Sequence, residues 1–435
     1  FKGVKMAKPA RNRKNRVSRK LRLEQLENRR VFAGLVFDSV ITTENFYPSK
    51  AYGYEAVRDS QGNTYASGLF DGTVDFDRNH TFADNHDILT VTFANQREGY
   101  LAKYNPQGML DWVRQVKNSA PTYVTIDGID QPILHLSYSG NVTIGDQTRT
   151  SQGLRDVLLA KFNDQGALQW MQTIGTQLDQ WPTQRVVADS QGRITVMVMT
   201  VDGDLRDLTV KQFMPDGSPS WQSDFGVGDV MLSGELLVAS DDSLILTGKY
   251  LGHVDIDPTS NIHLLNGSTD LRSDFIAKFT AAGALAWATS FRQDSVADSN
   301  STSSPKIAFG GDGSLAFLDI YHGEVSIVSA TGTTTLPIST TNVSVFGKLD
   351  LSTGALLSSH LLNGYISGGF VAIDGGYVIG GYTGGSGFDY LNGLTAPAFG
   401  SNDGYFVTLT EHGVADWVGL IGGTGIDTAW GLRSD

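Results

Sequence analysis

One eight-residue phrase occurs in six copies along this chain, and an internal repeat constrains a fold more than any single motif does. The first copy reads Leu101-Ala102-Lys103-Tyr104-Asn105-Pro106-Gln107-Gly108. The later copies begin at Leu159, Val210, Ile276, Phe346 and Val407. A tryptophan follows five of the copies, and these are Trp112, Trp170, Trp221, Trp287 and Trp417, while the fifth copy has Leu357 near that place. The chain is therefore built from units of about 60 residues.

Each unit reads as four β-strands. In the first unit these are Tyr52–Val57, Thr64–Phe70, Gly99–Tyr104 and Leu110–Val116, with a turn at Asp59–Asn63 after the first. Alternating Val, Tyr, Phe and Trp between clusters of Gly, Asn, Asp and Pro is typical of strands joined by hairpins. The sequence predicts an all-β fold, a β-propeller of four-stranded antiparallel blades. A solenoid is the alternative, but units of four strands favour a blade.

The repeats also set the expected boundaries. We expect a basic segment at 1–34 and a propeller at 35–435, with six recognisable repeats and the start of a seventh. The expected blades are 51–118, 119–177, 183–227, 230–294, 304–363 and 368–420, followed by a partial repeat at 421–435. Two interpretations of that last segment stay open. Either the chain is cut from a longer one, or its last strand closes a six-bladed ring against Val36–Thr43, because closure removes exposed sheet edges.

Charge is divided unevenly along the chain. Residues 1–30 hold twelve Lys or Arg and two Glu, whereas the other 405 residues hold 21 basic and 44 acidic groups. A basic run can neutralise phosphates, but the acidic body would repel them, so we do not expect a nucleic-acid partner. A solvated tail and a targeting segment are the other interpretations. The sequence contains no stretch of about 18 apolar residues, so it predicts no transmembrane helix. The absence of cysteine excludes disulfides and thiolate metal sites.

The basic segment also carries a motif. Leu21–Gly34 reads L-R-L-E-Q-L-E-N-R-R-V-F-A-G, and a short apolar run continues to Phe37. It resembles the N-terminal motif of planctomycete extracellular proteins, L-x-L-E-x-L-E-x-R-R. The resemblance implies export to the cell surface or medium and a natural start near Met6. We expect the segment itself to be disordered or helical.

The repeat phrases carry a second resemblance. The first unit contains D-S-x-G-N-x-Y-x-x-G at Asp59–Gly68, G-T-V-D-F-D at Gly72–Asp77, and A-K-Y-x-x-x-G-x-L-x-W at Ala102–Trp112. The fourth unit repeats the later parts at Gly252–Asp257 and Ala277–Trp287. These phrases resemble the bacterial SBBP repeat, which implies a β-propeller. NHL-like repeats share the first phrase but not the A-K-[YF] strand, and kelch-type repeats fit less well.

Two matched D-x-D pairs, Asp75 with Asp77 and Asp255 with Asp257, are the candidate metal ligands. Alternate strand residues face one side, so two carboxylates could chelate a hard cation such as calcium. The alternative is a turn-capping or solvated pair built into the repeat. A general acid and base are disfavoured, because a unique active site is not expected to recur in two units.

Three further patterns suggest a chemical or structural role. Two histidines and two aspartates gather in one loop, which suits a transition metal or simply a polar surface; they are His80, Asp84, His86 and Asp87. Asp59–Tyr65 nearly matches the sialidase Asp-box, but its Asp-to-Gly spacing is one residue too long. Recurrent strand lysines are expected to pair with an acid of the neighbouring blade; they are Lys103, Lys161, Lys211, Lys278 and Lys348.

Taken together, these patterns predict an exported, non-enzymatic β-propeller that serves as a binding or scaffold module of the cell surface or extracellular space. Protein or polysaccharide is the expected partner at the propeller face, and no catalytic residue or cofactor is assigned. The alternative is an extracellular hydrolase or lyase acting on polysaccharide. A single carboxylate cluster outside the repeat would favour that alternative, and the sequence shows none. Nucleic-acid binding through residues 7–30 is the third hypothesis.

Overall fold

The chain divides into two compact units, residues 1–38 and 39–435. A computed structural model describes parts of the second unit: 44–45, 50–77, 87–92, 96–119, 122–203, 205–225, 232–295, 304–362, 368–384, 388–389, 395–396 and 402–421. The predicted basic segment, Val36–Thr43 and residues 422–435 of the partial repeat lie outside the described residues. Its first residue, Ile421, ends the last described strand.

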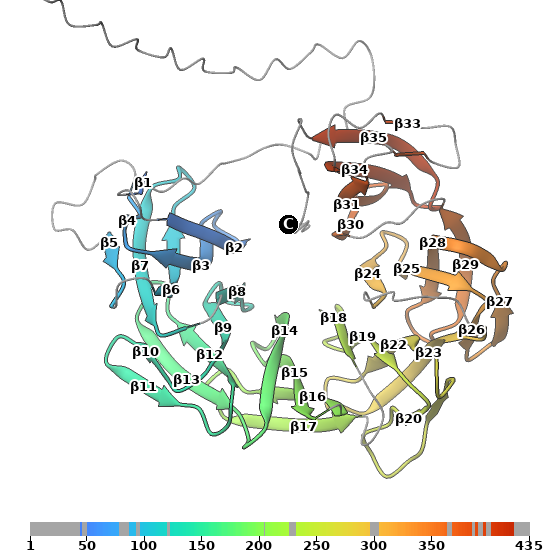
Figure 1. The fold of residues 1–435 in the computed structure, drawn as a ribbon, viewed down its shortest axis with the longest axis horizontal. Coiled ribbons are helices and arrows are strands. Elements are labelled where there is room, and N and C mark those ends of the chain that lie inside the picture. Colours follow the sequence, from blue (N-terminus) through green and yellow to red (C-terminus); the bar gives the residue numbers. More distant parts are fainter. Residues whose placement is uncertain are drawn as a thin grey trace, which may run out of the picture. The chain divides into compact units, whose positions relative to one another are not determined.

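Every regular element among the described residues is a β-strand, and all strand pairs are antiparallel, which confirms the predicted all-β class. The strands form six four-stranded meanders in which each strand lies beside the next (Figure 1). The first holds β2 (Lys50–Arg58), β3 (Thr64–Asp71), β6 (Arg97–Tyr104) and β7 (Leu110–Lys117); the second β8 (Thr122–Ile126), β9 (Pro132–Tyr138), β12 (Asp156–Phe162) and β13 (Leu168–Ile174); the third β14 (Asp179–Ala188), β15 (Ile194–Asp202), β16 (Leu205–Phe213) and β17 (Pro219–Phe225). The fourth holds β18 (Leu232–Val238), β19 (Leu244–Tyr250), β22 (Ser273–Phe279) and β23 (Leu285–Gln293); the fifth β24 (Lys306–Phe309), β25 (Ser314–Gly323), β28 (Ser339–Asp350) and β29 (Leu356–Leu362); the sixth β30 (Phe370–Ile373), β31 (Gly376–Gly384), β34 (Asn402–Thr410) and β35 (Ala415–Ile421).

Small hairpins are inserted between the second and third strands of most meanders. They are β4 (Thr73–Asp75) with β5 (Ile88–Thr90), β10 (Asn141–Ile144) with β11 (Gln147–Thr150), β20 (His253–Asp255) with β21 (Leu264–Asn266), β26 (Val325–Ser329) with β27 (Gly332–Thr335), and β32 (Phe388–Asp389) with β33 (Thr395–Ala396). Two of them leave their own meander: β10 pairs with β7, and β26 pairs with β23. The short strand β1 (Glu44–Asn45) pairs with β4. No described helix is long and apolar enough to cross a membrane.

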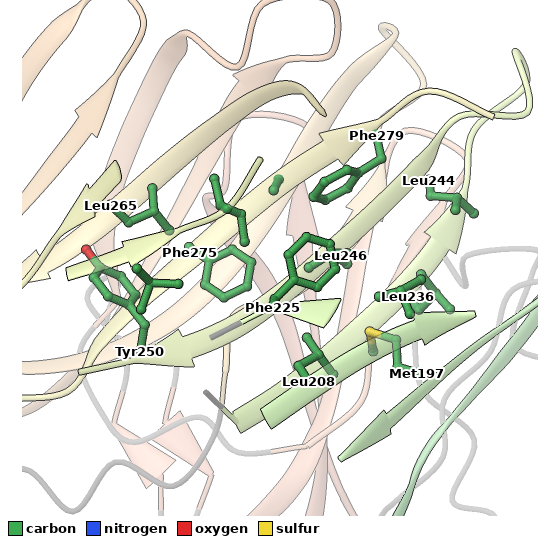
Figure 2. Packing of buried hydrophobic residues seen from close by; sticks show 14 residues of the cluster. Met197, Leu208, Phe225, Leu236, Leu244, Leu246, Tyr250, Leu265, Phe275 and Phe279 are labelled. Atoms are coloured by element: carbon green, nitrogen blue, oxygen red, sulfur yellow. The ribbon is translucent and has the colours of Figure 1, made fainter. Parts of the chain in front are cut away.

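Most of the hydrophobic core is divided among the spaces between successive sheets, and one further cluster lies within the first meander and its β4–β5 hairpin. Figure 2 shows the cluster between the third and fourth meanders, where Leu208 and Phe225 face Leu246 and Phe279. Similar clusters lie between the first and second, second and third, fourth and fifth, and fifth and sixth meanders. Burying one Leu or Phe contributes roughly 1.5–3 kcal/mol, so each interface is a large share of the stability.

The first strands of successive meanders also contact one another: β2 with β8, β8 with β14, β14 with β18, β18 with β24, and β24 with β30. The sheets are thus stacked in sequence order, each against the next.

The recurrent tryptophans hold one sheet to the next. The Trp112 indole Nε1 donates to the Asp164 carbonyl at 2.8 Å, and Trp287 donates to the Leu351 carbonyl at 3.1 Å. Each acceptor lies in the turn between the third and fourth strands of the following meander. Trp170 and Trp221 make equivalent bonds to the carbonyls of Pro215 and Ala281. Four of the five recurrent tryptophans are therefore inter-sheet contacts.

Candidate functional site

The first D-x-D pair lies at the end of β4 in the β4–β5 hairpin: Asp75 is the last residue of β4, and Asp77 follows it in the turn. Asp75 and Asp77 are buried, and the Asp77 backbone N–H donates to Asp75 Oδ1 at 2.9 Å. The Phe76 backbone N–H donates to the carbonyl of Asp87, which is also buried. The first aspartate therefore caps a turn. His80, Asp84 and His86 lie outside the described residues.

The second pair occupies the same place in the β20–β21 hairpin, but Asp255 is exposed to solvent and Asp257 is half-buried. Asp255 Oδ1 accepts the backbone N–H of Asp257 at 3.1 Å and that of His263 at 2.9 Å. Asp257 Oδ1 accepts the N–H and hydroxyl of Thr259. The two pairs share one turn geometry, so the repeat conserves the turn while burial differs. Within the described ranges, no group of three His, Asp or Glu side chains is placed to hold a metal ion. The calcium site stays a prediction.

The Asp-box-like segment is likewise a turn between strands. Asp59 Oδ1 accepts the backbone N–H groups of Gln61 at 3.0 Å and Asn63 at 2.7 Å. Asp189 makes the same two bonds with Gln191 and Arg193 in the third meander. Such side-chain caps satisfy backbone donors in a tight turn.

The strand lysines depart from the prediction in their partners. Lys103 does pair with Asp164 of the next meander. Lys161, however, pairs at 2.7 Å with Asp127 of its own meander, and it reaches the next one through the Pro215 carbonyl at 3.4 Å. Lys278 and Lys348 also pair with acids of their own meanders. For these three lysines the partner is the acid in the turn between the first and second strands of the same meander.

Lys211 does not occupy the strand position that the other recurrent lysines share. Phe213 pairs with Ile194 as Phe279 pairs with Leu244, so the residue before Phe213 corresponds to the other lysines. That residue is Gln212, which is buried and bonds Thr195. Lys211 instead lies over the Phe213 ring.

A buried charge cluster that the sequence analysis missed lies between the fourth and fifth meanders. Lys249 on β19 contacts both carboxylate oxygens of Asp274 on β22, at 2.7 and 3.0 Å. Asp319 on β25 lies nearby and accepts the Ile320 backbone N–H at 2.8 Å. All three side chains are buried. One cation thus faces two carboxylates in a low-dielectric interior.

Burial and mutual repulsion set the protonation of this cluster. Burial raises the pKa of Asp274 to about 6, against the attraction of Lys249. Burial first, and then the charge of Asp274, raise the pKa of Asp319 well above its usual range. The direct contact with Lys249 favours the ionised form of Asp274, so Asp319 is the carboxyl with the stronger tendency to hold a proton.

The cluster does not repeat. The positions equivalent to Lys249 in the register are Leu69, Ser137 and Met199 in the first three meanders. The expectation that every acid recurs with the repeat is therefore wrong for Asp274 and Asp319. The sequence indicates this cluster only through one charged residue in each of two apolar strands, L-I-L-T-G-K-Y and S-L-A-F-L-D-I-Y.

A cavity of about 410 Å³ lies along β23, and we call it the β23 groove. Its floor is formed by alternate residues of β23, namely Ala286, Ala288, Ser290 and Arg292, together with Trp287. One wall is His263 with strand β21, which follows it, and the other is Val328–Ala330 at the end of β26, with Thr353 also in the lining. The Asp255 turn fixes the first wall, because its carboxylate holds the His263 N–H.

The described residues define an all-β repeat protein of four-stranded antiparallel sheets, and a groove lies on the outer strand of the fourth sheet. No protein-family model and no curated protein matches the chain. Among solved structures, BamB from Moraxella catarrhalis is similar at 14% identity and a TM-score of 0.34, covering 84% of this chain and 96% of that one.

Two enzymes are similar at comparable levels. The quinohemoprotein alcohol dehydrogenase from Comamonas testosteroni has 10% identity and a TM-score of 0.34, covering 87% of this chain and 69% of that one. The exotype rhamnogalacturonan lyase YesX has 12% identity and a TM-score of 0.26, covering 83% and 73%. TM-scores this low carry no argument about this chain.

Proposed function

We propose that this chain is an exported, non-enzymatic β-propeller that serves as a binding or scaffold module of the cell surface or extracellular space. The β23 groove carries the proposal. The groove is lined by both apolar and polar side chains, and ligand-binding sites commonly combine the two. The charged groups of the repeats are used inside the fold, in Asp-capped turns and in lysine pairs.

The propeller part of the proposal rests on topology. Four-stranded meanders that succeed one another, with neighbouring first strands in contact, are the arrangement of blades around an axis. The phrases at Asp59–Gly68 and Ala102–Trp112 support kinship with SBBP repeats. Export and a planctomycete surface location rest on the motif at Leu21–Gly34.

Export is tested by following the tagged full chain in a planctomycete host. We expect it in the envelope or medium, and we expect the double variant Arg29→Ala, Arg30→Ala to stay in the cytoplasm. Binding is tested by retention of the purified chain on isolated envelopes. Cytoplasmic wild-type protein, or a chain that binds no envelope material, would contradict the proposal.

A polysaccharide hydrolase or lyase is the second candidate, and the buried Asp274–Asp319 pair favours it. Two adjacent carboxylates whose pKa values are both raised by burial are candidates for general acid and base catalysis. A panel of polysaccharides incubated with the chain would then yield new chain ends, and Asp274→Asn or Asp319→Asn would abolish them. No product in wild type would leave the cluster with a structural role.

A further inference from the structure

Only the C-terminal half of the outer edge of β23 pairs with another described strand. β26 pairs with its last four residues, from Ser290 to Gln293. Just beyond, the Asp294 backbone N–H donates to the Glu324 carbonyl at 2.8 Å, so the backbone groups of Asp294 point toward β26. Backbone direction alternates along a strand, so those of Ser290 and Ala288 point the same way. Among the described residues, no strand pairs with this edge before Ser290.

The groove leaves that open edge accessible. Ala286 and Ala288 present only methyl groups, so an incoming backbone can approach closely. Leu264 on the opposite wall is 51% exposed and offers an apolar contact. A volume of about 410 Å³ accommodates roughly three residues of an extended chain.

The groove differs in charge from the rest of the second unit. Its lining includes Arg292 and His263 and no carboxylate, although the described unit is strongly acidic overall. Arg292 pairs with Asp294 through Nε at 2.5 Å, which anchors it at the β26 end of the groove. Its terminal nitrogens make no hydrogen bond to a described residue, so a carboxylate of an occupant near that end can accept from them.

We propose that the β23 groove binds an extended, acidic peptide segment of another protein, which adds to the Leu285–Thr289 edge as an antiparallel strand. The inference rests on the proposed binding function and names its partner class. The edge continues an interface that β26 already forms, so the required backbone geometry is present. Backbone bonds supply most of the affinity in strand addition, and side-chain pockets supply selectivity.

The test uses the full chain and fluorescent heptapeptides that alternate valine and threonine. One peptide carries a glutamate near its N-terminus, a second carries lysine there, and a third is the glutamate peptide with alternate backbone nitrogens methylated. Fluorescence anisotropy should give a dissociation constant of about 1 mM or tighter for the glutamate peptide. The methylated peptide should bind at least about tenfold more weakly, because it lacks the backbone donors.

A matched pair of variants locates the site. Ala288→Pro removes an outward N–H from β23 without removing a bond to β22, and edge strands tolerate proline. Gln222→Pro makes the same change at the equivalent position of β17, where Gln222 pairs with Lys211 as Ala288 pairs with Ala277. We expect Ala288→Pro to weaken peptide binding about tenfold or more, and Gln222→Pro to leave it unchanged.

Hydrogen exchange on the wild type tests the site independently of the variants' folding. The Ala288 amide should become protected when the glutamate peptide is added. Absence of binding, equal binding of the methylated peptide, or protection elsewhere would each overturn the proposal. Failure of export or envelope retention would instead contradict the proposed function while leaving peptide binding measurable.

Discussion

A glycine and a tryptophan act together at the junction of successive sheets. The Trp287 indole packs against the turn of the fifth meander at Gly354, whose φ is +71°. A Cβ added there would lie 2.5 Å from the ring. Gly166, Gly217 and Gly283 meet Trp112, Trp170 and Trp221 in the same way. The repeat therefore requires glycine for both backbone conformation and close packing.

Substitution of two glycines separates these requirements. Gly354→Ala adds both left-handed strain and a clash with Trp287, so we expect a loss of about 2–4 kcal/mol of unfolding free energy. Gly313→Ala has a similar φ of +80° but open space around its Cβ, and it should cost about 1–2 kcal/mol. Urea unfolding of both variants measures the difference. Equal losses would show that the indole contact contributes nothing.

The buried cluster makes stability depend on pH. The folded-state pKa of Asp319 lies above its unfolded value, so its favourable contribution is complete below pH of about 4 and is lost as the pH rises through the folded pKa. Asp319→Asn keeps the oxygen that accepts the Ile320 N–H but cannot ionise. We expect this variant to gain stability relative to wild type as the pH rises. Thermal midpoints between pH 4 and pH 9 measure it, and parallel curves would be inconsistent with a protonated Asp319.

The sequence could predict some of these residues and not others. Trp112 and Trp287 stand in a recurrent phrase, so their shared role was visible. In V-K-Q-F the lysine of the phrase shifted by one residue, and only strand pairing shows that Gln212 takes its place. Lys249 and Asp319 come from different meanders, and their contact depends on how two sheets stack, which periodicity does not encode.

At the scale of elements, the D-x-D turn shapes an inserted hairpin. Asp255→Ala removes two hydrogen bonds at the β20–β21 end, and we expect it to cost about 1–2 kcal/mol. Asp255→Asn keeps an acceptor oxygen and should cost little. If the pair also bound calcium, Asp255→Asn would lose stability as well, and that loss would be seen only in calcium buffer. Chemical unfolding with calcium and with chelator distinguishes these outcomes.

The four strands of the first unit were predictable to within one or two residues. Tyr52–Val57 lies within β2, and Leu110–Val116 within β7. Alternation and turn residues are local signals, so they mark strands well. The pairing of β10 with β7 and of β26 with β23 was not foreseen, because it joins one unit to the preceding one. The β23 groove depends on that pairing and so was invisible in the sequence.

At the scale of the whole described unit, five core clusters are each shared by two successive sheets, while a sixth lies within the first meander and its β4–β5 hairpin. The cluster with Ile245 and Phe291 of the fourth meander also contains Phe317 and Val345 of the fifth. Stability is then a sum of sheets and of the interfaces between neighbours, as in other repeat proteins. Damage at one interface should loosen its two sheets before the others.

Breaking one buried ion pair tests this neighbour coupling. Lys249→Met leaves Asp274 buried without its cation, and such a break costs about 3–5 kcal/mol. We expect hydrogen exchange, followed by mass spectrometry, to rise first in the fourth and fifth meanders. Lys161→Met breaks the equally buried pair with Asp127 in the second meander, and the rise should move to the second and third. If both variants raised exchange evenly across all described strands, the sheets would open as one cooperative body, and the interfaces could not be treated as separate contributions to stability.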